Sequence, residues 1–290
     1  MLMFSASIPA KDAKTTSSVP PKAKMKRYHP KQAVTNYQQD VDAEMAWYKR
    51  NPHLRDHHFL TKWPFAHITR HKLAYKYFRN RARISIKQYI GSLQDSGSAS
   101  CLVAPCGTNA DQDILEGIAN EYFAIDLVKP AKELPNIHIH EGDILKNPYK
   151  NNSFDIIASF LFFHHLHKVG FDKFLDEFSR IIRKNGILLI IEPSALFPVS
   201  WVTAVGKKIF GNISGLVPDE APLIPNRLNQ ALRRAGFRVE KFEALSFSHN
   251  RIPVPIQHII NWSTIPLRRI YPFSYLGWMC LWICTKEGLP

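Results

Sequence analysis

The fold is decided by residues 153–193, which read SFDIIASFLFFHHLHKVGFDKFLDEFSRIIRKNGILLIIEP. Within them, Phe154–Phe160 is a short apolar run bounded by turn residues, as is typical of a buried parallel strand. Phe171–Lys184 carries apolar residues at helical spacing with charges on its opposite side, which predicts an amphipathic helix. Ile187–Ile191 is a second apolar, β-branched run. Strand, crossover helix and strand in this order predict a right-handed βαβ unit of a parallel sheet.

Strands and helices continue to alternate on both sides of this unit. The further strands that we expect are Cys101–Pro105, Phe123–Asp126, Ile137–His140, Phe237–Leu245 and Leu276–Thr285, and the further helices are Asp111–Tyr122 and Ile224–Ala235. This alternation predicts an α/β fold with a doubly wound, mostly parallel sheet. The last two strands lack a sheet-crossing helix between them, so an antiparallel strand is expected at the edge of the sheet or inside it.

Three motifs of the central stretch occur together. Phe154–Asp155 opens the strand, His164–His165 follows it, and Arg180–Gly186 ends in an Asn-Gly pair, a turn that stops a helix because it tolerates positive φ. The arrangement closely resembles class I S-adenosylmethionine-dependent methyltransferases, and among them the small-molecule and lipid-acting type 11 branch, where the helix ends in Arg-x-Leu-Lys-Pro-Gly-Gly. The resemblance covers residues 100–286. It implies a Rossmann-like sheet of seven strands with the antiparallel strand inside, and S-adenosylmethionine as the cofactor.

The loop after the first strand is expected to contact the cofactor, because ligands of open α/β sheets bind at the carboxyl ends of the strands. The family reads Leu-Asp-x-Gly-Cys-Gly-Thr-Gly there, and this chain reads LVAPCGTN over residues 102–109. The resemblance assigns contacts with the methionine part of the cofactor to Ala104, Cys106, Gly107 and Thr108. Val103, Pro105 and Asn109 depart from the family pattern. These departures leave open weakened or lost cofactor binding, and with it a non-catalytic scaffold or assembly protein.

Two acids at strand ends match the family's other cofactor contacts. The resemblance implies that Asp126, which ends the second strand, accepts hydrogen bonds from the ribose hydroxyls. It also implies that Asp143, after the third strand, meets the adenine amino group while Ile144 packs on the ring. Leu127 and Phe160 complete the expected cofactor-binding set. The alternative for both aspartates is that they cap nearby turns.

Methyl transfer from a sulfonium needs mainly a well-positioned acceptor, together with a base where the acceptor must lose a proton. His165 and His164 are the catalytic candidates because they follow the fourth strand and histidine titrates near neutrality. Only one of the two is expected to face the site, and both could instead position the loop by hydrogen bonds. Glu192, at the end of the fifth strand, could face the acceptor or be paired structurally. No metal site is expected, because Cys101 and Cys106 lack the further ligands that zinc needs.

The acceptor is expected to be recognised outside the shared core, by insertions over residues 193–223 and 250–273. The second insertion contains Trp262, several isoleucines and Arg268–Arg269. Such a mixture suits a lid over a hydrophobic acceptor, a segment lying on a membrane interface, or a simple cover of the sheet. We therefore expect O- or C-methylation of a small-molecule acceptor that is hydrophobic or lipid-linked. Peripheral membrane contact stays open, and the oligomeric state is not predicted.

Charge is distributed unevenly along the 290 residues. Residues 1–91 hold 18 Lys and Arg against 5 Asp and Glu, and the whole chain has a formal net charge of +14. We expect a disordered basic tail over residues 1–30 and a helical N-terminal extension over residues 31–97, with helices at Val34–Arg50 and Ala66–Leu93. The methyltransferase domain is expected over residues 98–290. The basic part suits an anionic partner or a merely solvated surface.

An RNA acceptor is an alternative that would use the basic N-terminus. Ser159–Phe162, after the fourth strand, lacks the Pro-Pro-aromatic loop that amino-group methylases use, which disfavours N-methylation of bases. No stretch reaches the roughly 18 apolar residues that a membrane span needs, and the start lacks the pattern of a secretory signal. We therefore expect a cytoplasmic protein, with or without membrane association.

Overall fold

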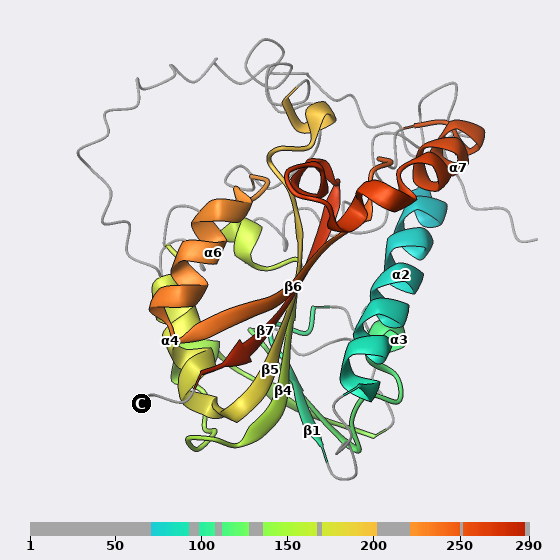
Figure 1. Ribbon diagram of the computed structural model, residues 1–290. Helices are drawn as coiled ribbons and strands as arrows, with labels where there is room; N and C mark the ends of the chain where they lie inside the picture. Colours follow the sequence, from blue (N-terminus) through green and yellow to red (C-terminus); the bar gives the residue numbers. More distant parts are fainter. Residues whose placement is uncertain are drawn as a thin grey trace, which may run out of the picture. The chain divides into compact units, whose positions relative to one another are not determined.

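The computed structural model of the protein describes residues 71–92, 99–107, 112–127, 136–166, 170–201, 221–249 and 252–287 (Figure 1). The chain divides into two units, residues 1–34 and residues 35–290, and every described residue belongs to the second. The predicted tail and the predicted helix Val34–Arg50 lie outside the described residues.

Seven strands form one sheet in the order β3-β2-β1-β4-β5-β7-β6. Their bounds are β1 Ser100–Val103, β2 Glu121–Asp126, β3 Ile137–Glu141, β4 Phe154–Phe160, β5 Ile182–Pro193, β6 Phe237–Ser246 and β7 Met279–Lys286. Neighbouring strands are parallel except where β7 runs antiparallel between β5 and β6. The doubly wound α/β fold predicted from the sequence is confirmed. The antiparallel strand lies inside the sheet, as the resemblance implied.

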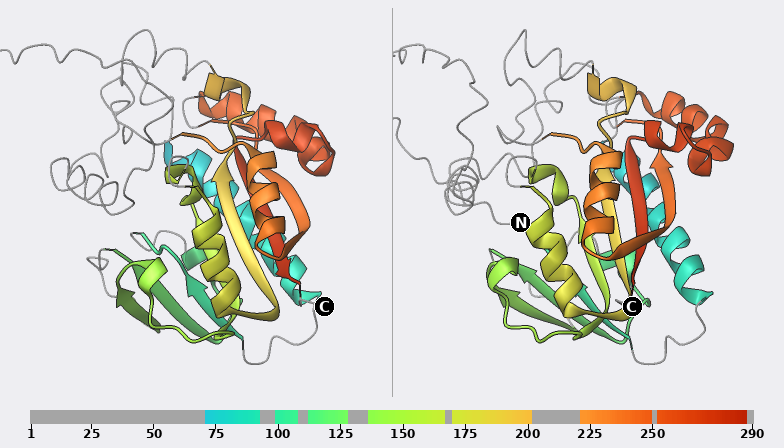
Figure 2. Two further views of the ribbon diagram at one scale, coloured as in Figure 1. Left: turned by 90° about the vertical axis from the view of Figure 1, so that its left-hand side faces the viewer. Right: turned by 60° about the vertical axis from the view of Figure 1, so that its left-hand side comes forward.

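Helices cover both faces of the sheet. The α-helices are α2 His71–Gly91, α3 Gln112–Leu115, α4 Asp172–Ile181, α6 Pro225–Arg234 and α7 Val254–Ser263, and the 3-10 helices are η3 Ile144–Lys146, η4 Phe163–His165, η5 Ile265–Arg269 and η6 Phe273–Leu276. Helices α2 and α3 lie on one face and α4 and α6 on the other (Figures 1 and 2). The helix that the sequence predicts over Ala66–Leu93 is thus found over its described part as α2.

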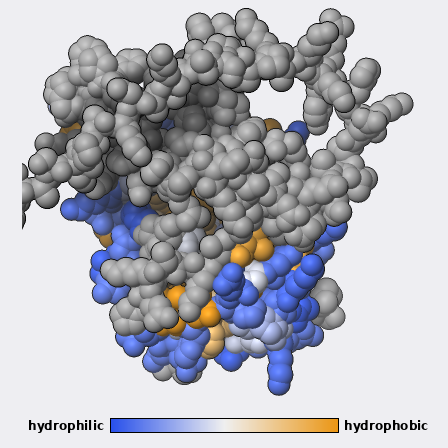
Figure 3. Space-filling model, turned by 180° about the vertical axis from the view of Figure 1, so that it is seen from behind, coloured by the Kyte–Doolittle hydropathy of each residue, from blue (hydrophilic) through white to orange (hydrophobic). Residues whose placement is uncertain are grey.

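The core consists of two apolar layers, one on each face of the sheet. Phe78 of α2 packs in one layer with Leu189 of β5, and Phe174 of α4 packs in the other with Leu188. Strand β5 is therefore buried on both faces, which explains its continuous apolar run. Each large side chain buried in this way contributes about 1.5–3 kcal/mol to folding. From behind, the described part of the surface is mostly hydrophilic, with a small apolar area (Figure 3).

Helix α3 is much shorter than the predicted helix Asp111–Tyr122. It ends at Leu115, and Gly117 then adopts a φ of 72°, which breaks the helix. The hydroxyl of Tyr122 donates to the carbonyl of Leu115 at 2.7 Å and accepts from the N–H of Ile118 at 3.1 Å. Tyr122 itself belongs to β2, so the predicted helix was wrong over its second half.

The predicted helix Phe171–Lys184 overruns α4, which ends where Ile182 takes extended backbone. Asn185, with a φ of 61°, lies in the irregular beginning of β5 and does not end the helix. At Gly186, an added Cβ would lie 2.6 Å from Cγ1 of Ile182 and 3.0 Å from the carbonyl oxygen of Asp155. Glycine is therefore required here by the close approach of β4 and β5.

The first and the last strand of the chain also differ from their predicted bounds. Strand β1 ends at Val103, before the predicted Pro105, because the chain bends at Ala104–Pro105. Strand β7 begins at Met279, later than the predicted Leu276, because Phe273–Leu276 forms η6. The predicted bounds of β4 agree with the structure at both ends.

The parallel strands bring several loops to one edge of the sheet. Strands β1 to β5 run in the same direction, so the segments that follow them leave from a shared carboxyl edge. Strand β6 runs parallel to β5, since both are antiparallel to β7. The segment after β6, which contains α7, therefore leaves from the same carboxyl edge as the loops with the candidate site residues.

Candidate functional site

The loop after β1 is held by the strands on either side of it. The N–H of Ala104 donates to the carbonyl of Ala158 in β4 at 2.9 Å, and the N–H of Cys106 donates to the carbonyl of Ile125 in β2 at 3.0 Å. Gly107 follows with a φ of 52°, and a Cβ added there would meet no atom within 4 Å. The backbone thus bends at a glycine that has open space beside it, which suits the close approach of a ligand.

Asp126 lies at the junction of three loops of the carboxyl edge. Its Oδ2 accepts a hydrogen bond from the N–H of Gly107 at 2.7 Å. Its backbone carbonyl accepts from the N–H of Gly142, after β3, at 2.8 Å. The structure therefore brings together Gly107 and Asp126, which the sequence predicted as neighbours in one pocket.

Asp143 caps the short helix η3, because its Oδ1 accepts from the N–H of Leu145 at 2.9 Å. Ile144 is buried among the apolar side chains of the layer that contains α4. Phe160 is buried in the opposite layer, whereas Leu127 is exposed. Oδ1 of Asp143 thus has the turn-capping role, which was the alternative to a contact with the adenine. Thr108 and Asn109 lie outside the described residues.

Cys106 is a buried thiol beside the carboxylate of Asp126. Burial raises the pKa of Cys106 to about 12, and the negative charge of Asp126 acts in the same direction. Burial also raises the pKa of Tyr149 to about 12, with a further contribution from Cys106. Cys106 therefore stays protonated at neutral pH and acts as a small apolar wall, not as a nucleophile. Tyr149 is a neighbour that the sequence did not reveal.

The four cysteines are free and buried. Within the described part of the chain, no group of three or more His, Cys, Asp or Glu side chains could hold a metal ion.

The loop after β4 is organised by Glu192 at the end of β5. Glu192 is fully buried, and its Oε1 accepts from the N–H groups of Phe162 at 2.7 Å and Phe163 at 2.6 Å. Its Oε2 lies 2.8 Å from Nδ1 of His164. Of the two roles left open for Glu192, the structure therefore realises the paired one.

The two histidines differ in their surroundings. His164 is buried and directed at Glu192, whereas His165 is half-buried, with its ring centroid 4.1 Å from that of His164. Both belong to η4, which leaves the carboxyl edge after β4. His165 is thus the better placed of the pair to reach a bound molecule, and His164 positions the loop through Glu192.

Comparisons with known proteins agree with this geometry. Residues 102–190 match a family of methyltransferase domains, the type 11 family. A comparison with curated protein sequences finds no match.

Two solved structures share the fold. One is an S-adenosylmethionine-dependent methyltransferase of Thermotoga maritima, described as a possible histamine N-methyltransferase, with 16% identity, a TM-score of 0.51, and coverage of 72% of this chain and 91% of that one. The other is the 1,6-didemethyltoxoflavin-N1-methyltransferase of Burkholderia thailandensis, solved with 1,6-didemethyltoxoflavin and S-adenosylhomocysteine. It has 13% identity, a TM-score of 0.53, and coverage of 90% of this chain and 94% of that one.

Proposed function

We propose that this chain, which is a class I S-adenosylmethionine-dependent methyltransferase of the type 11 branch, methylates an oxygen or a carbon of a small hydrophobic or lipid-linked acceptor. The observation that carries the proposal is the junction of Gly107 and Asp126 at the carboxyl edge. The acceptor class rests on the apolar segment that follows β6 and leaves from that same edge.

The residues at the junction fit the cofactor. We assign the methionine part to the loop with Ala104, Cys106 and Gly107, whose open space admits a ligand against the backbone. Asp126 would bind the ribose hydroxyls, since a carboxylate accepts from both. When bound, S-adenosylmethionine supplies a methyl group already activated by its sulfonium. The protein then has mainly to hold the acceptor in line, an effect worth up to about 7–11 kcal/mol.

His165 is assigned the proton transfer. Its ring is the more exposed of the two histidine rings. The contact between Glu192 and His164 holds the loop that carries it. A hydroxyl or carbon acid of the acceptor would give its proton to this ring as the new bond to the methyl group forms. Histidine suits the task because its pKa lies near the working pH.

Asp126→Ala is expected to weaken the binding of S-adenosylhomocysteine at least roughly tenfold, because hydrogen bonds to a charged group contribute about 1.5–3 kcal/mol. The change also removes the acceptor of the Gly107 N–H. Isothermal titration calorimetry measures the affinity. Glu141→Ala, an exposed acid at the end of the neighbouring β3, is the matched control and should bind like the parent. Equal affinity of Asp126→Ala and the parent would refute the pocket assignment.

His165→Ala is expected to lower turnover roughly 100-fold or more while changing cofactor affinity little, because a general base typically contributes 10²–10⁴. Transfer of a labelled methyl group into a cell extract, followed by mass spectrometry, gives both the rate and the identity of the acceptor. The pH profile of the parent should lose its low-pH limb in the variant. Equal losses of turnover and of cofactor affinity would contradict a role as base.

An RNA acceptor is less well supported by the basic side chains of α2. Arg79 pairs with Asp113, and Arg83 with Glu116. Arg81 pairs with Glu243 at 2.6 Å. Three of the basic side chains of α2 are thus engaged by acids of the protein, which weakens their case as contacts for a phosphate backbone.

A further inference from the structure

Within residues 252–276, which lie between β6 and β7, many large apolar side chains are exposed whereas the buried side chains are polar. Apolar residues that are 39–75% exposed form an outward surface, here called the apolar face: Ile256, Ile259, Trp262, Ile265, Ile270, Tyr271, Phe273 and Leu276. The buried residues of the stretch 252–276 are polar instead, namely Gln257, Asn261, Arg268 and Ser274. This pattern is the reverse of a helix that covers a core.

Hydrogen bonds fix the segment in this orientation. Asn261 of α7 donates to Oγ of Ser248 at 2.7 Å and accepts from Oγ of Ser246 at 3.1 Å. Gln257 donates to the carbonyl of Ile252, at the start of the segment. Turning the apolar residues inward would leave these buried groups without partners, which is energetically costly. These hydrogen bonds therefore hold the apolar face toward the outside of the protein.

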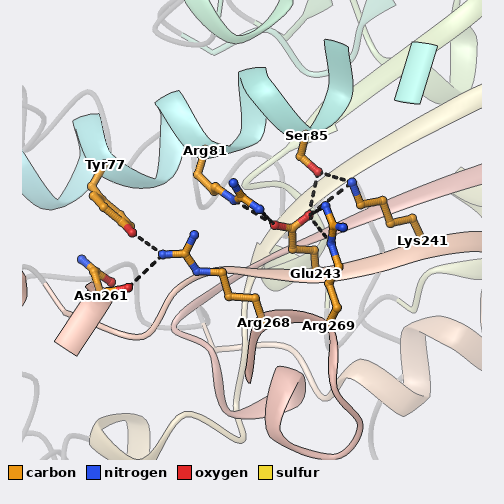
Figure 4. A network of polar contacts seen from close by, with 8 residues as sticks. All are labelled: Tyr77, Arg81, Ser85, Lys241, Glu243, Asn261, Arg268 and Arg269. Atoms are coloured by element: carbon orange, nitrogen blue, oxygen red, sulfur yellow. Dashed lines mark hydrogen bonds and ion pairs between the residues drawn. The ribbon is translucent and has the colours of Figure 1, made fainter. Parts of the chain in front are cut away.

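A polar network beneath the apolar face carries an excess of positive charge (Figure 4). The carboxylate of Glu243 is fully buried, and Arg81, Lys241 and Arg269 surround it at 2.6–3.3 Å. Arg268 is also buried, and it donates to the hydroxyl of Tyr77 and to the carbonyl of Asn261, both neutral. Among the described residues, this network therefore holds four cations and one carboxylate, and three of the cations contact that carboxylate.

The chemistry of the segment identifies what covers it. Residues 252–276 contain no Asp or Glu, and Arg269 beside the apolar face remains half-exposed. Isoleucines that insert into lipid, aromatic rings at the interface and arginines near the headgroups are the composition of an interfacial membrane segment. No helix of the described residues has the length and apolar character needed to cross a bilayer. We propose that the apolar face docks this protein on the surface of an anionic lipid membrane.

A second copy of the chain fits the apolar face less well. A symmetric pair would bring two identical excesses of positive charge together across the contact. An anionic bilayer instead offers acyl chains to the isoleucines and phosphates to the half-exposed Arg269, and its negative surface attracts basic residues near it. Docking would also serve methyl transfer, an argument that rests on the proposed function. The segment that carries the apolar face leaves the sheet at the carboxyl edge. A lipid-linked acceptor would enter there without crossing water.

Vesicle sedimentation with the full chain tests the proposal. The protein is mixed with vesicles of phosphatidylcholine alone or of phosphatidylcholine with phosphatidylglycerol. We expect binding to the anionic vesicles that weakens as salt is added. The double variant Ile259→Ser with Trp262→Ser should lower the partition coefficient roughly tenfold or more, because two large apolar side chains no longer enter the lipid.

A matched pair of single variants separates this face from apolar exposure in general. Ile256 on α7 and Ile84 on α2 are 47% and 48% exposed. Ile256→Ser should weaken vesicle binding, whereas Ile84→Ser should bind like the parent. Urea unfolding checks that all variants keep the parent's stability.

The proposal is overturned if the parent does not bind anionic vesicles or if the double variant binds them as tightly as the parent. It is also overturned if the two single variants bind vesicles equally well. It is also overturned if the parent is a dimer that ignores vesicles and that the double variant dissociates, because a second copy then covers the apolar face. Sedimentation is measured without cofactor or acceptor. A negative result would therefore leave the cofactor pocket untouched, and calorimetry with S-adenosylhomocysteine reports on that pocket separately.

Discussion

Glu243→Ala is expected to lower the free energy of unfolding by about 3–5 kcal/mol, the usual result of removing one partner from a buried ion pair. The substitution leaves Arg81, Lys241 and Arg269 in a partly buried site with no carboxylate. It also removes the acceptor of the Ser85 hydroxyl, which lies 2.7 Å from Oε2. Urea unfolding followed by circular dichroism measures the loss.

An exposed ion pair provides the control. Asp172 of α4 pairs with Arg234 of α6, and both side chains are more than half exposed. Asp172→Ala should cost at most about 1 kcal/mol, because solvent screens such pairs. Losses of similar size for the two variants would mean that Glu243 does not anchor α2 and η5 to β6.

The same carboxylate makes the free energy of unfolding depend on pH in the acidic range. Burial alone would raise the pKa of Glu243, but hydrogen bonds from Ser85 and Arg81 and the charges of Arg81 and Lys241 outweigh it and lower the pKa from 4.5 to about 2. A lowered pKa stabilises the fold above pH 4.5, and that stabilisation is lost as the pH falls from 4.5 toward 2. The stabilisation lost across this window is about 3 kcal/mol at most, because solvent screens the partly exposed arginines. Glu243→Gln should flatten the pH dependence of the urea midpoint in this window.

The fold was predictable where apolar runs and turns coincide. The predicted bounds of β4, Phe154–Phe160, agree with the structure because turn residues flank an uninterrupted apolar run. The missing crossover helix before the last strand predicted an antiparallel strand, but its position inside the sheet could be stated only through the family resemblance. Nothing in the apolar pattern of Met279–Lys286 distinguishes an inner antiparallel strand from a parallel one.

Helix ends were less predictable because competing local contacts decide them. The apolar residues Ile114, Leu115 and Ile118 continue at helical spacing, yet Gly117 turns to positive φ and Tyr122 closes the end from β2. Such an end depends on the register of a later strand. The sequence of the helical segment alone does not contain that information.

The candidate site was predictable to the level of the loop. The sequence placed Gly107 and Asp126 after and at the end of neighbouring strands. The parallel register brings the N–H of Gly107 to 2.7 Å from Oδ2 of Asp126. It could not decide between the roles of Glu192, because the choice depends on which side of β4 and β5 its side chain reaches. Two partners of the buried Glu243 are 158 and 162 residues away along the chain, at Ser85 and Arg81. No local pattern links them.

Glu192→Ala is expected to disorder the loop after β4 and to lower the free energy of unfolding by about 3 kcal/mol or more. Three donors, the N–H groups of Phe162 and Phe163 and Nδ1 of His164, would lose their acceptor. A buried donor left without a partner costs about 1–3 kcal/mol. Because η4 also carries His165, methyl transfer should fall with the loss of order. Urea unfolding and transfer of a labelled methyl group measure the two effects.

Glu192→Gln separates positioning from catalysis. The amide oxygen can still accept from Phe162 and Phe163, and its NH₂ group can donate to Nδ1 of His164 once that ring takes its other tautomer. A positioning residue is therefore rescued, and the Gln variant should keep most of the parent's stability and turnover. A carboxylate that itself took the proton of the acceptor would not be rescued. Loss of turnover in the Gln variant as deep as in the Ala variant, with stability intact, would move the base from His165 to Glu192.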